Sequence, residues 1–314
     1  MKIVRIIRGI AGAPLNQTNP LRALRQALAY QIVRRILPMK IVVPYVDELR
    51  LLIGPGQTAA NANYYNGLFE LDEQCFLGHL ARSGDLFVDV GANVGTFALI
   101  PASRGAHVVA FEPASETCPH LLDNIRINGL GSMIEVDTRA LTDRSGRLTF
   151  TFGRGSTNRV VRDAAQHENN AHTREVEGVT LDDALGGRSP VAVKLDVEGH
   201  ELSVLRGATQ TLGGEEPLAV VVEVRRENTG ETGHSRHTGH SGASGASGAS
   251  HESEIRAIMD GHGMEARGYD PFSRQLVGEA QRPKSRNVIF VRDEAFFAAR
   301  LRDAAAIHIR GESL

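Results

Sequence analysis

The stretch that decides the fold runs from Leu86 to Thr96 and reads Leu-Phe-Val-Asp-Val-Gly-Ala-Asn-Val-Gly-Thr. Its first half, Leu86–Val90, is a short apolar run, which predicts a strand buried on both faces, as in a parallel sheet. A helix is expected directly afterwards, over residues 94–103. Glycine lets the backbone approach a ligand closely, and a helix N-terminus offers free N–H groups. A strand, a glycine-rich turn and a helix in this order therefore predict a site for a nucleotide-type cofactor.

Strands and helices keep alternating after this turn, and such βαβ repetition predicts an α/β fold with a mostly parallel sheet and helices on both faces. An inserted pair of strands is expected at 148–152 and 175–179, and a final antiparallel edge at 264–269 and 287–291. The other expected strands are 107–111, 133–136, 191–197 and 218–224, and the expected helices are 114–128, 201–212 and 252–262.

Composition narrows the class of protein. The 314 residues are 41% hydrophobic and carry a formal charge of −2, so a full core is possible and nothing in the global charge favours nucleic acid. The two cysteines, Cys75 and Cys118, provide no disulfide framework, as expected in a reducing compartment. No apolar run reaches the roughly 18 residues of a membrane span. We therefore expect a cytoplasmic globular protein with no nucleic-acid partner and no membrane span, and the composition leaves its oligomeric state open.

The N-terminal segment, residues 1–68, differs from the rest of the chain. Its first forty residues contain eight Lys or Arg and not one Asp or Glu. Apolar residues recur there at helical spacing, which predicts an amphipathic helix with its arginines on the other face; they are Leu21, Leu24, Leu28, Ile32 and Ile36. We expect an accessory packing or lid helix. A site for an anionic partner or a membrane surface is the alternative.

Residues 227–253 follow the predicted cofactor-binding core of 69–226. Residues 241–250 repeat Ser-Gly-Ala, which supplies too little apolar surface to offset ordering entropy, so a flexible insertion is expected. A metal-binding histidine tract is the alternative, but its spacing is loose and no cysteine or carboxylate joins it; the histidines are His234, His237, His240 and His251. Residues 254–314 are expected to complete the sheet and add a terminal helix.

A carboxylate follows the second strand of the core. Glu112, in Phe-Glu-Pro at 111–113, comes 21 positions after Gly91 and is expected at the carboxyl edge of the neighbouring strand, where it can accept both ribose hydroxyls of an adenosine. Capping of the next helix is the alternative. A dinucleotide fingerprint would need glycines where the chain has Asn93 and Thr96, so a nicotinamide-dependent oxidoreductase is the less favoured enzyme class.

A charged cluster ends another strand, in Lys-Leu-Asp-Val-Glu-Gly-His-Glu at 194–201. Strand alternation places Lys194, Asp196 and Glu198 on one face, and His200 and Glu201 begin the next helix. Ion pairing by Lys194 and capping by Glu201 explain part of this charge but not all of it. We therefore expect these residues at a site.

These motifs, taken together and in this order, resemble the FkbM-like methyltransferases over about residues 69–224. The resemblance implies a Rossmann-like class I methyltransferase fold with a seven-stranded sheet, S-adenosylmethionine as cofactor, and O-methylation of a sugar or a secondary metabolite. It also implies a ribose contact by Glu112, a place for Asp196 at the methyl-transfer site, and a cofactor lining of Asp89, Gly91, Asn93 and Gly95. The segments that carry it are 89–96, 111–113, 124–128, 180–183, 194–201, 205–208 and 222–223.

Methyl transfer to oxygen needs mainly an oriented nucleophile and a base for its proton. Asp196 and His200 both qualify, and the sequence leaves the choice open. Glu198, Glu201 and Glu223 are expected to bind the acceptor. A divalent cation shared by Asp196 and Glu223 is conceivable, but no metal is predicted. A module that binds the cofactor without catalysing transfer is a further alternative.

Overall fold

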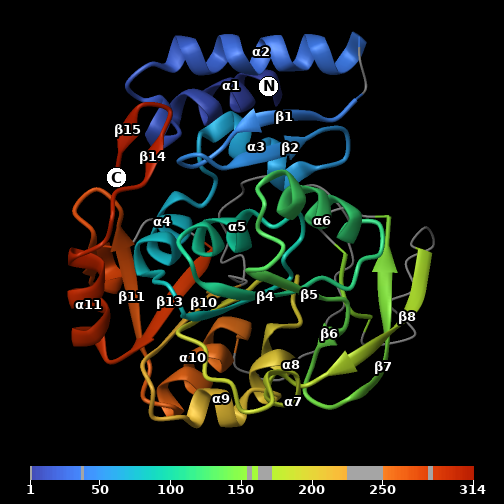
Figure 1. The fold of residues 1–314 in the computed structure, drawn as a ribbon, viewed down its shortest axis with the longest axis vertical. Helices are drawn as coiled ribbons and strands as arrows, with labels where there is room; N and C mark the ends of the chain where they lie inside the picture. Colours follow the sequence, from blue (N-terminus) through green and yellow to red (C-terminus); the bar gives the residue numbers. More distant parts are fainter. Residues whose placement is uncertain (1, 37–38, 154–157, 162–171, 225–249, 282–285) are drawn as a thin grey trace.

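An eight-stranded sheet forms the centre of the molecule (Figure 1). The computed structural model describes residues 2–36, 39–153, 158–161, 172–224, 250–281 and 286–314. The sheet order is β12-β11-β13-β10-β9-β3-β4-β5. These strands are β3 (Leu86–Val90), β4 (His107–Phe111), β5 (Ile134–Asp137), β9 (Ala192–Leu195), β10 (Leu218–Glu223), β11 (Glu265–Asp270), β12 (Gln275–Val277) and β13 (Asn287–Arg292).

The sheet is mostly parallel, as predicted. Strands β5, β4, β3, β9 and β10 pair in parallel, and β13 is inserted antiparallel between β10 and β11. The expectation of an antiparallel edge at 264–269 and 287–291 was therefore half wrong. Because β11 pairs antiparallel with the reversed β13, it runs in the same direction as β10. The short β12 raises the strand number from the predicted seven to eight.

Helices cover both faces of the sheet (Figure 1), because side chains of each strand alternate between two cores. On β4, Val108 and Ala110 pack in one core, and Val109 and Phe111 in the other. The first core contains α4 (Leu71–Leu80), α5 (Thr96–Ser103), α6 (Cys118–Ile127) and α11 (Glu294–Arg302). The second contains α7 (Leu181–Leu185), α8 (Glu201–Arg206), α9 (Thr209–Gly213) and α10 (His251–Gly261).

The helix predicted over 201–212 is broken into α8 and α9 at Gly207. A Cβ at this glycine would lie 2.1 Å from the backbone oxygen of Thr142, so the chain there packs directly against neighbouring backbone. Helix α5 begins at Thr96, two residues later than predicted. The turn before it uses positive φ angles at Asn93 (52°) and Gly95 (90°), which a helix cannot contain.

A separate three-stranded sheet stands at one side, in the order β6-β8-β7. Its strands are β6 (Ala140–Leu141), β7 (Gly146–Phe152) and β8 (His172–Val179), so the predicted inserted pair is present. Residues 225–249, which hold most of the predicted flexible insertion and His234, His237 and His240, lie outside the described residues. His251 is described, at the first turn of α10.

The N-terminal arm consists of α1 (Lys2–Gly12) and α2 (Pro20–Ile36), followed by the hairpin of β1 (Ile41–Pro44) and β2 (Arg50–Ile53) and by α3 (Thr58–Asn66). A helix was predicted here, but its packing face was predicted wrongly. Ala23, Ala27 and Tyr30 are the buried residues of α2, whereas most of the leucine and isoleucine stripe is exposed. The exposed members are Leu21, Leu28, Ile32 and Ile36. Among the described helices, none is long and apolar enough to cross a membrane.

Candidate active site

Two adjoining pockets open at the carboxyl ends of β3, β4, β9 and β10, which is where ligands bind in open α/β sheets. We name them by one residue each. The Phe150 pocket holds about 560 Å³ of empty space and the Glu223 pocket about 1040 Å³, the open space at their mouths included. Their common wall consists of Gly91, Asn93, Asp196 and Glu198.

The turn after β3 forms part of this common wall. A Cβ on Gly91 would lie 1.9 Å from the backbone oxygen of Asp196, and its φ of +81° also favours glycine. The turn can therefore pass against β9 only with glycine at this position. Gly95 does not line either pocket; it allows the chain to enter α5 with a φ of +90°.

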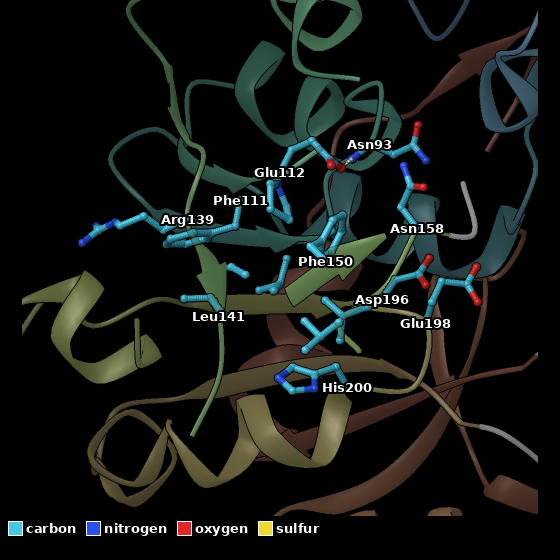
Figure 2. A pocket seen from close by; sticks show the side chains of 16 residues that line it. Asn93, Phe111, Glu112, Arg139, Leu141, Phe150, Asn158, Asp196, Glu198 and His200 are labelled. Atoms are coloured by element: carbon cyan, nitrogen blue, oxygen red, sulfur yellow. Dashed lines mark hydrogen bonds between the residues drawn. The ribbon is translucent and has the colours of Figure 1, made fainter. Parts of the chain in front are cut away.

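Glu112 lies at the end of β4 and faces the Phe150 pocket (Figure 2). Its Oε2 accepts a hydrogen bond from Asn93 N and its Oε1 accepts one from Ala114 N, both at 2.8 Å. These bonds fix the carboxylate and leave each oxygen with capacity for a further donor. Burial raises the pKa of Glu112 to about 7, although the two backbone bonds act in the opposite direction.

The remainder of the Phe150 pocket is largely apolar. Figure 2 shows the ring of Phe150 among the other lining side chains, which include Phe111, Leu141 and Val160. Asn158 and Arg139 add polar groups, and Glu116 Oε1 accepts a hydrogen bond from Asn158 Nδ2 at 3.0 Å. The places of Phe150, Leu141 and Val160 could not be predicted from the sequence, because an apolar residue that lines a pocket has the same pattern as one in the core.

Three carboxylates gather where the two pockets meet. Oxygens of Asp196, Glu198 and Glu223 lie within 4.8 Å of one another, close enough to share protons or to bind one divalent cation. Burial raises the pKa of Glu223, and the charges of Asp196 and Glu198 raise it further. A carboxyl group that holds its proton more tightly than usual is thus built into the Glu223 pocket.

Lys194 supplies the buried positive charge of this cluster. Its Nζ lies 3.2 Å from Asp196 Oδ2 and 4.6 Å from the ring centroid of Phe97. Burial lowers the pKa of Lys194, but the carboxylates of Asp196, Glu70 and Asp89 raise it by more, so the ammonium stays charged. The ion pair anticipated from the sequence is present, and it lies on the wall of the Glu223 pocket.

Other residues of the Glu223 pocket come from segments that carried no motif. Thr58, Ala59 and Asn63 line it from α3, and Glu70 lines it immediately before α4. Glu70 Oε1 accepts a hydrogen bond from Asn287 Nδ2 at 2.9 Å, and burial raises the pKa of Glu70. Glu70 is half-buried and has a left-handed φ of 54°, and neither property can be read from the sequence.

Three predicted site residues line neither pocket: Asp89, Glu201 and, as described above, Gly95. Asp89 is buried inside β3 and does not line either pocket. Glu201 also lies outside both pockets; it is fully buried, accepts a hydrogen bond from Gly199 N at 2.8 Å, and lies 3.1 Å from His251 Nε2. His200 lines only the Phe150 pocket, where its Nε2 lies 3.1 Å from Thr142 Oγ1. Of the two candidate bases, only Asp196 lies between the pockets.

Comparisons with known proteins agree with this arrangement. A family model described as the methyltransferase FkbM domain matches residues 89–271. The hexuronic acid methyltransferase AglP of Haloferax volcanii is 33% identical over 135 residues, which are 42% of this chain and 53% of that protein. The 31-O-demethyl-FK506 methyltransferase FkbM of Streptomyces tacrolimicus is 34% identical over 115 residues, 34% of this chain and 43% of that one.

A solved structure, the methyltransferase FkbM of Methylobacillus flagellatus, aligns with a TM-score of 0.41 and 14% identity over 68% of this chain and 44% of its own. This chain matches about half the length of the two curated relatives. The family match, by contrast, covers more than half of this chain and includes the end of β3, all of β4, β9 and β10, and the residues between them. The chain therefore belongs to the FkbM methyltransferase family.

Proposed function

We propose that this protein is an S-adenosylmethionine-dependent O-methyltransferase that methylates a hydroxyl of a sugar or of a similar small natural product. The observation that carries the proposal is the position of Asp196 on the wall between two pockets. The Phe150 pocket combines an apolar slot with a carboxylate, Glu112, that backbone N–H groups hold in place, as a nucleoside requires. The Glu223 pocket is lined by four carboxyl groups, to which the hydroxyl groups of an acceptor can donate.

The residues of the Phe150 pocket suit S-adenosylmethionine. Glu112 has oxygens free to accept from the ribose hydroxyls, and Phe150, Leu141 and Val160 offer an apolar slot for the adenine. Gly91 has no side chain, so its backbone lies directly against the backbone of Asp196 on the pocket wall. The bound cofactor would supply an electrophilic methyl group on a sulfonium.

The protein's part in the reaction is to orient the acceptor oxygen and to take its proton. Asp196 lines both pockets, and its Oδ2 lies 3.2 Å from the Nζ of Lys194. Asp196 would accept the proton of the acceptor hydroxyl while that oxygen is methylated. We therefore assign the base to Asp196 and a supporting role in the Phe150 pocket to His200.

The Glu223 pocket favours a neutral acceptor. Four carboxyl groups line it, from Glu70, Asp196, Glu198 and Glu223, and its two cations are Lys194 and Arg286. Both cations lie near carboxylates, at 3.2 Å (Lys194 to Asp196) and 3.6 Å (Arg286 to Glu223). Hydroxyl groups can donate to the remaining carboxylate oxygens, whereas an anion would add negative charge to a crowded site.

One assay tests the proposal: release of S-adenosylhomocysteine on mixing protein, S-adenosylmethionine and a panel of neutral glycosides, with calorimetry of cofactor binding on the same preparation. Turnover that depends on an acceptor is the expected result. Binding of NAD at an affinity comparable to that of S-adenosylmethionine would favour an oxidoreductase instead. Tight S-adenosylmethionine binding without turnover on any hydroxylated acceptor would indicate a binding module.

A further inference from the structure

Exposed apolar side chains are concentrated on the N-terminal arm. Of the thirteen large hydrophobic side chains that are exposed among the described residues, ten lie between Val4 and Val42. On α2, Leu21 is 66% exposed, Leu28 63% and Ile36 70%. Scattered exposed aliphatic residues are normal on a protein surface, but a contiguous group usually marks an interaction site.

The packing of α2 holds this apolar stripe toward the solvent. At 100° per residue, Leu21, Leu28 and Ile32 fall on one face of the helix, and Ala23 and Ala27 on the opposite one. The alanine face is the buried one, and it packs with Tyr30 toward α3. The hydroxyl of Tyr30 donates to Asn61 Oδ1 at 2.9 Å, which fixes the rotation of the helix. The large side chains therefore face outward because small ones fit against α3.

The same surface is strongly basic. The chain contains eight Lys or Arg before its first acidic residue, Asp47. Arg22, Arg25 and Arg35 are exposed on α2 beside the apolar stripe, and Arg8 is exposed on α1. Aliphatic side chains flanked by arginines match an interface in which apolar chains lie below a layer of anionic groups.

We propose that α1 and α2 form a docking surface for an anionic membrane surface, with the aliphatic stripe in the headgroup and acyl boundary and the arginines on lipid phosphates. Nucleic acid fits less well, since it would pair with the arginines but leave the aliphatic stripe without a partner. Its single strands are bound by stacking aromatics, and the arm's tyrosine, Tyr30, is buried. A second copy of the chain fits less well too, because like charges would meet across the interface.

The docking surface is adjacent to the acceptor side of the molecule. Helix α2 packs on α3 through Tyr30 and Tyr64, whose ring centroids are 5.2 Å apart. Thr58, Ala59 and Asn63 of the same α3 line the Glu223 pocket. Membrane docking would thus hold this pocket one helix away from the lipid surface.

Flotation of the full chain with vesicles tests the proposal. One set contains phosphatidylcholine alone and the other about 30% phosphatidylglycerol in phosphatidylcholine. We expect binding to the anionic set only. Leu28→Ser with Ile32→Ser should weaken it on the order of tenfold for each side chain, since each burial is lost. Arg25→Gln should weaken it on the order of fivefold, as expected for one basic side chain near an anionic surface.

The matched control is Phe272→Ser, which removes a large side chain that is 62% exposed but lies outside the arm. It should leave flotation unchanged, and all variants should keep the parent's melting temperature because the replaced side chains do not pack in the core. Three results would overturn the proposal: no flotation with either set, equal loss in the control, or a dimer by sedimentation velocity that Leu28→Ser and Ile32→Ser dissociate.

Discussion

The two pockets share a wall, yet they are assembled from the chain in different ways. The fixed polar groups of the Phe150 pocket, Glu112 and the turn at Gly91–Gly95, follow consecutive strands, β3 and β4. The Glu223 pocket is assembled from α3, α4, β9, β10 and the start of β13, which are separated by more than two hundred residues of sequence. Local motifs thus specify one half of the site, and tertiary packing brings together the other.

The pockets also differ in charge. Glu112 is the acidic residue that belongs to the Phe150 pocket alone, and backbone N–H groups hold both of its oxygens. Charged groups in the Glu223 pocket form ion pairs with one another, as Lys194 does with Asp196. Mutations in the Phe150 pocket should therefore change cofactor binding, and mutations in the Glu223 pocket should change the rate of methylation or the choice of acceptor.

The largest expected effect tests the wall that the pockets share. Asp196→Asn keeps the shape of the side chain but removes the proton acceptor, so single-turnover methylation should fall about 10²–10⁴-fold while the cofactor still binds. Lys194 would still have the carboxylates of Glu70 and Asp89 nearby, so the protein should remain folded.

If Asp196 served only to pair with Lys194, the same change would cost about 3–5 kcal/mol of stability and leave turnover near normal. Measuring the unfolding midpoint and single-turnover rate on one preparation separates the two outcomes. His200→Ala is the companion variant. A larger loss of rate in His200→Ala than in Asp196→Asn would transfer the role of base to the histidine.

The next effect concerns the Phe150 pocket alone. Glu112→Ala should weaken S-adenosylmethionine binding by about 1.5–3 kcal/mol, the range for a hydrogen bond to a charged group. Calorimetry measures the change directly. Glu135→Ala is a suitable control, because that side chain is 61% exposed and lines neither pocket. An unchanged dissociation constant in Glu112→Ala would show that the ribose is held elsewhere.

This contrast also explains how far the sequence could predict the molecule. The strands at 86–90 and 107–111 were predicted to the residue, because buried parallel strands are apolar runs with clear ends. The sequence did not predict that β13 runs antiparallel to β10 while β11 runs in the same direction as β10. The direction of a strand depends on its neighbours in the sheet, not on its hydrophobic pattern. Packing of α2 through Ala23 and Ala27 was missed because the larger apolar stripe predicted the opposite face.

The site shows the same division. Glu112 and Asp196 were found from their places after strands, and both line pockets. Glu70 and Phe150 were not found, because a single acid before a helix and an aromatic residue in a strand are common in any fold. Glu201 looked equivalent to Glu198 in the sequence. Glu201 is the first residue of α8, and its carboxylate accepts a hydrogen bond from the backbone N–H of Gly199.

A third prediction tests the charge of the Glu223 pocket. A neutral glycoside should be methylated with a higher kcat/KM than the matching uronide, by on the order of 2 kcal/mol for charges ~8 Å apart at an effective dielectric constant of ~20. Above pH 8, where Glu223 has lost its proton, Glu223→Gln should narrow this preference, and so should added salt. Preference for the uronide would instead indicate that the cations, Lys194 and Arg286, select the acceptor.

The smallest effect is a pH dependence confined to the Phe150 pocket. Burial raises the pKa of Glu112 to about 7, so below that pH the carboxyl carries a proton that it must release before it can accept from two ribose hydroxyls. Affinity for S-adenosylmethionine should therefore increase as the pH rises from 6 to 8, by roughly tenfold for one ionisation of this pKa. Stability of the free protein should change in the opposite direction. The folded carboxyl holds its proton more tightly than the unfolded one, so the stability that this proton contributes is lost as the pH rises toward 7.

Asp89 is an alternative origin of the pH dependence of affinity, because burial raises its pKa to about 7 as well. Glu112→Gln separates the two: a flat affinity between pH 6 and 8 assigns the effect to Glu112, and an unchanged slope assigns it to Asp89.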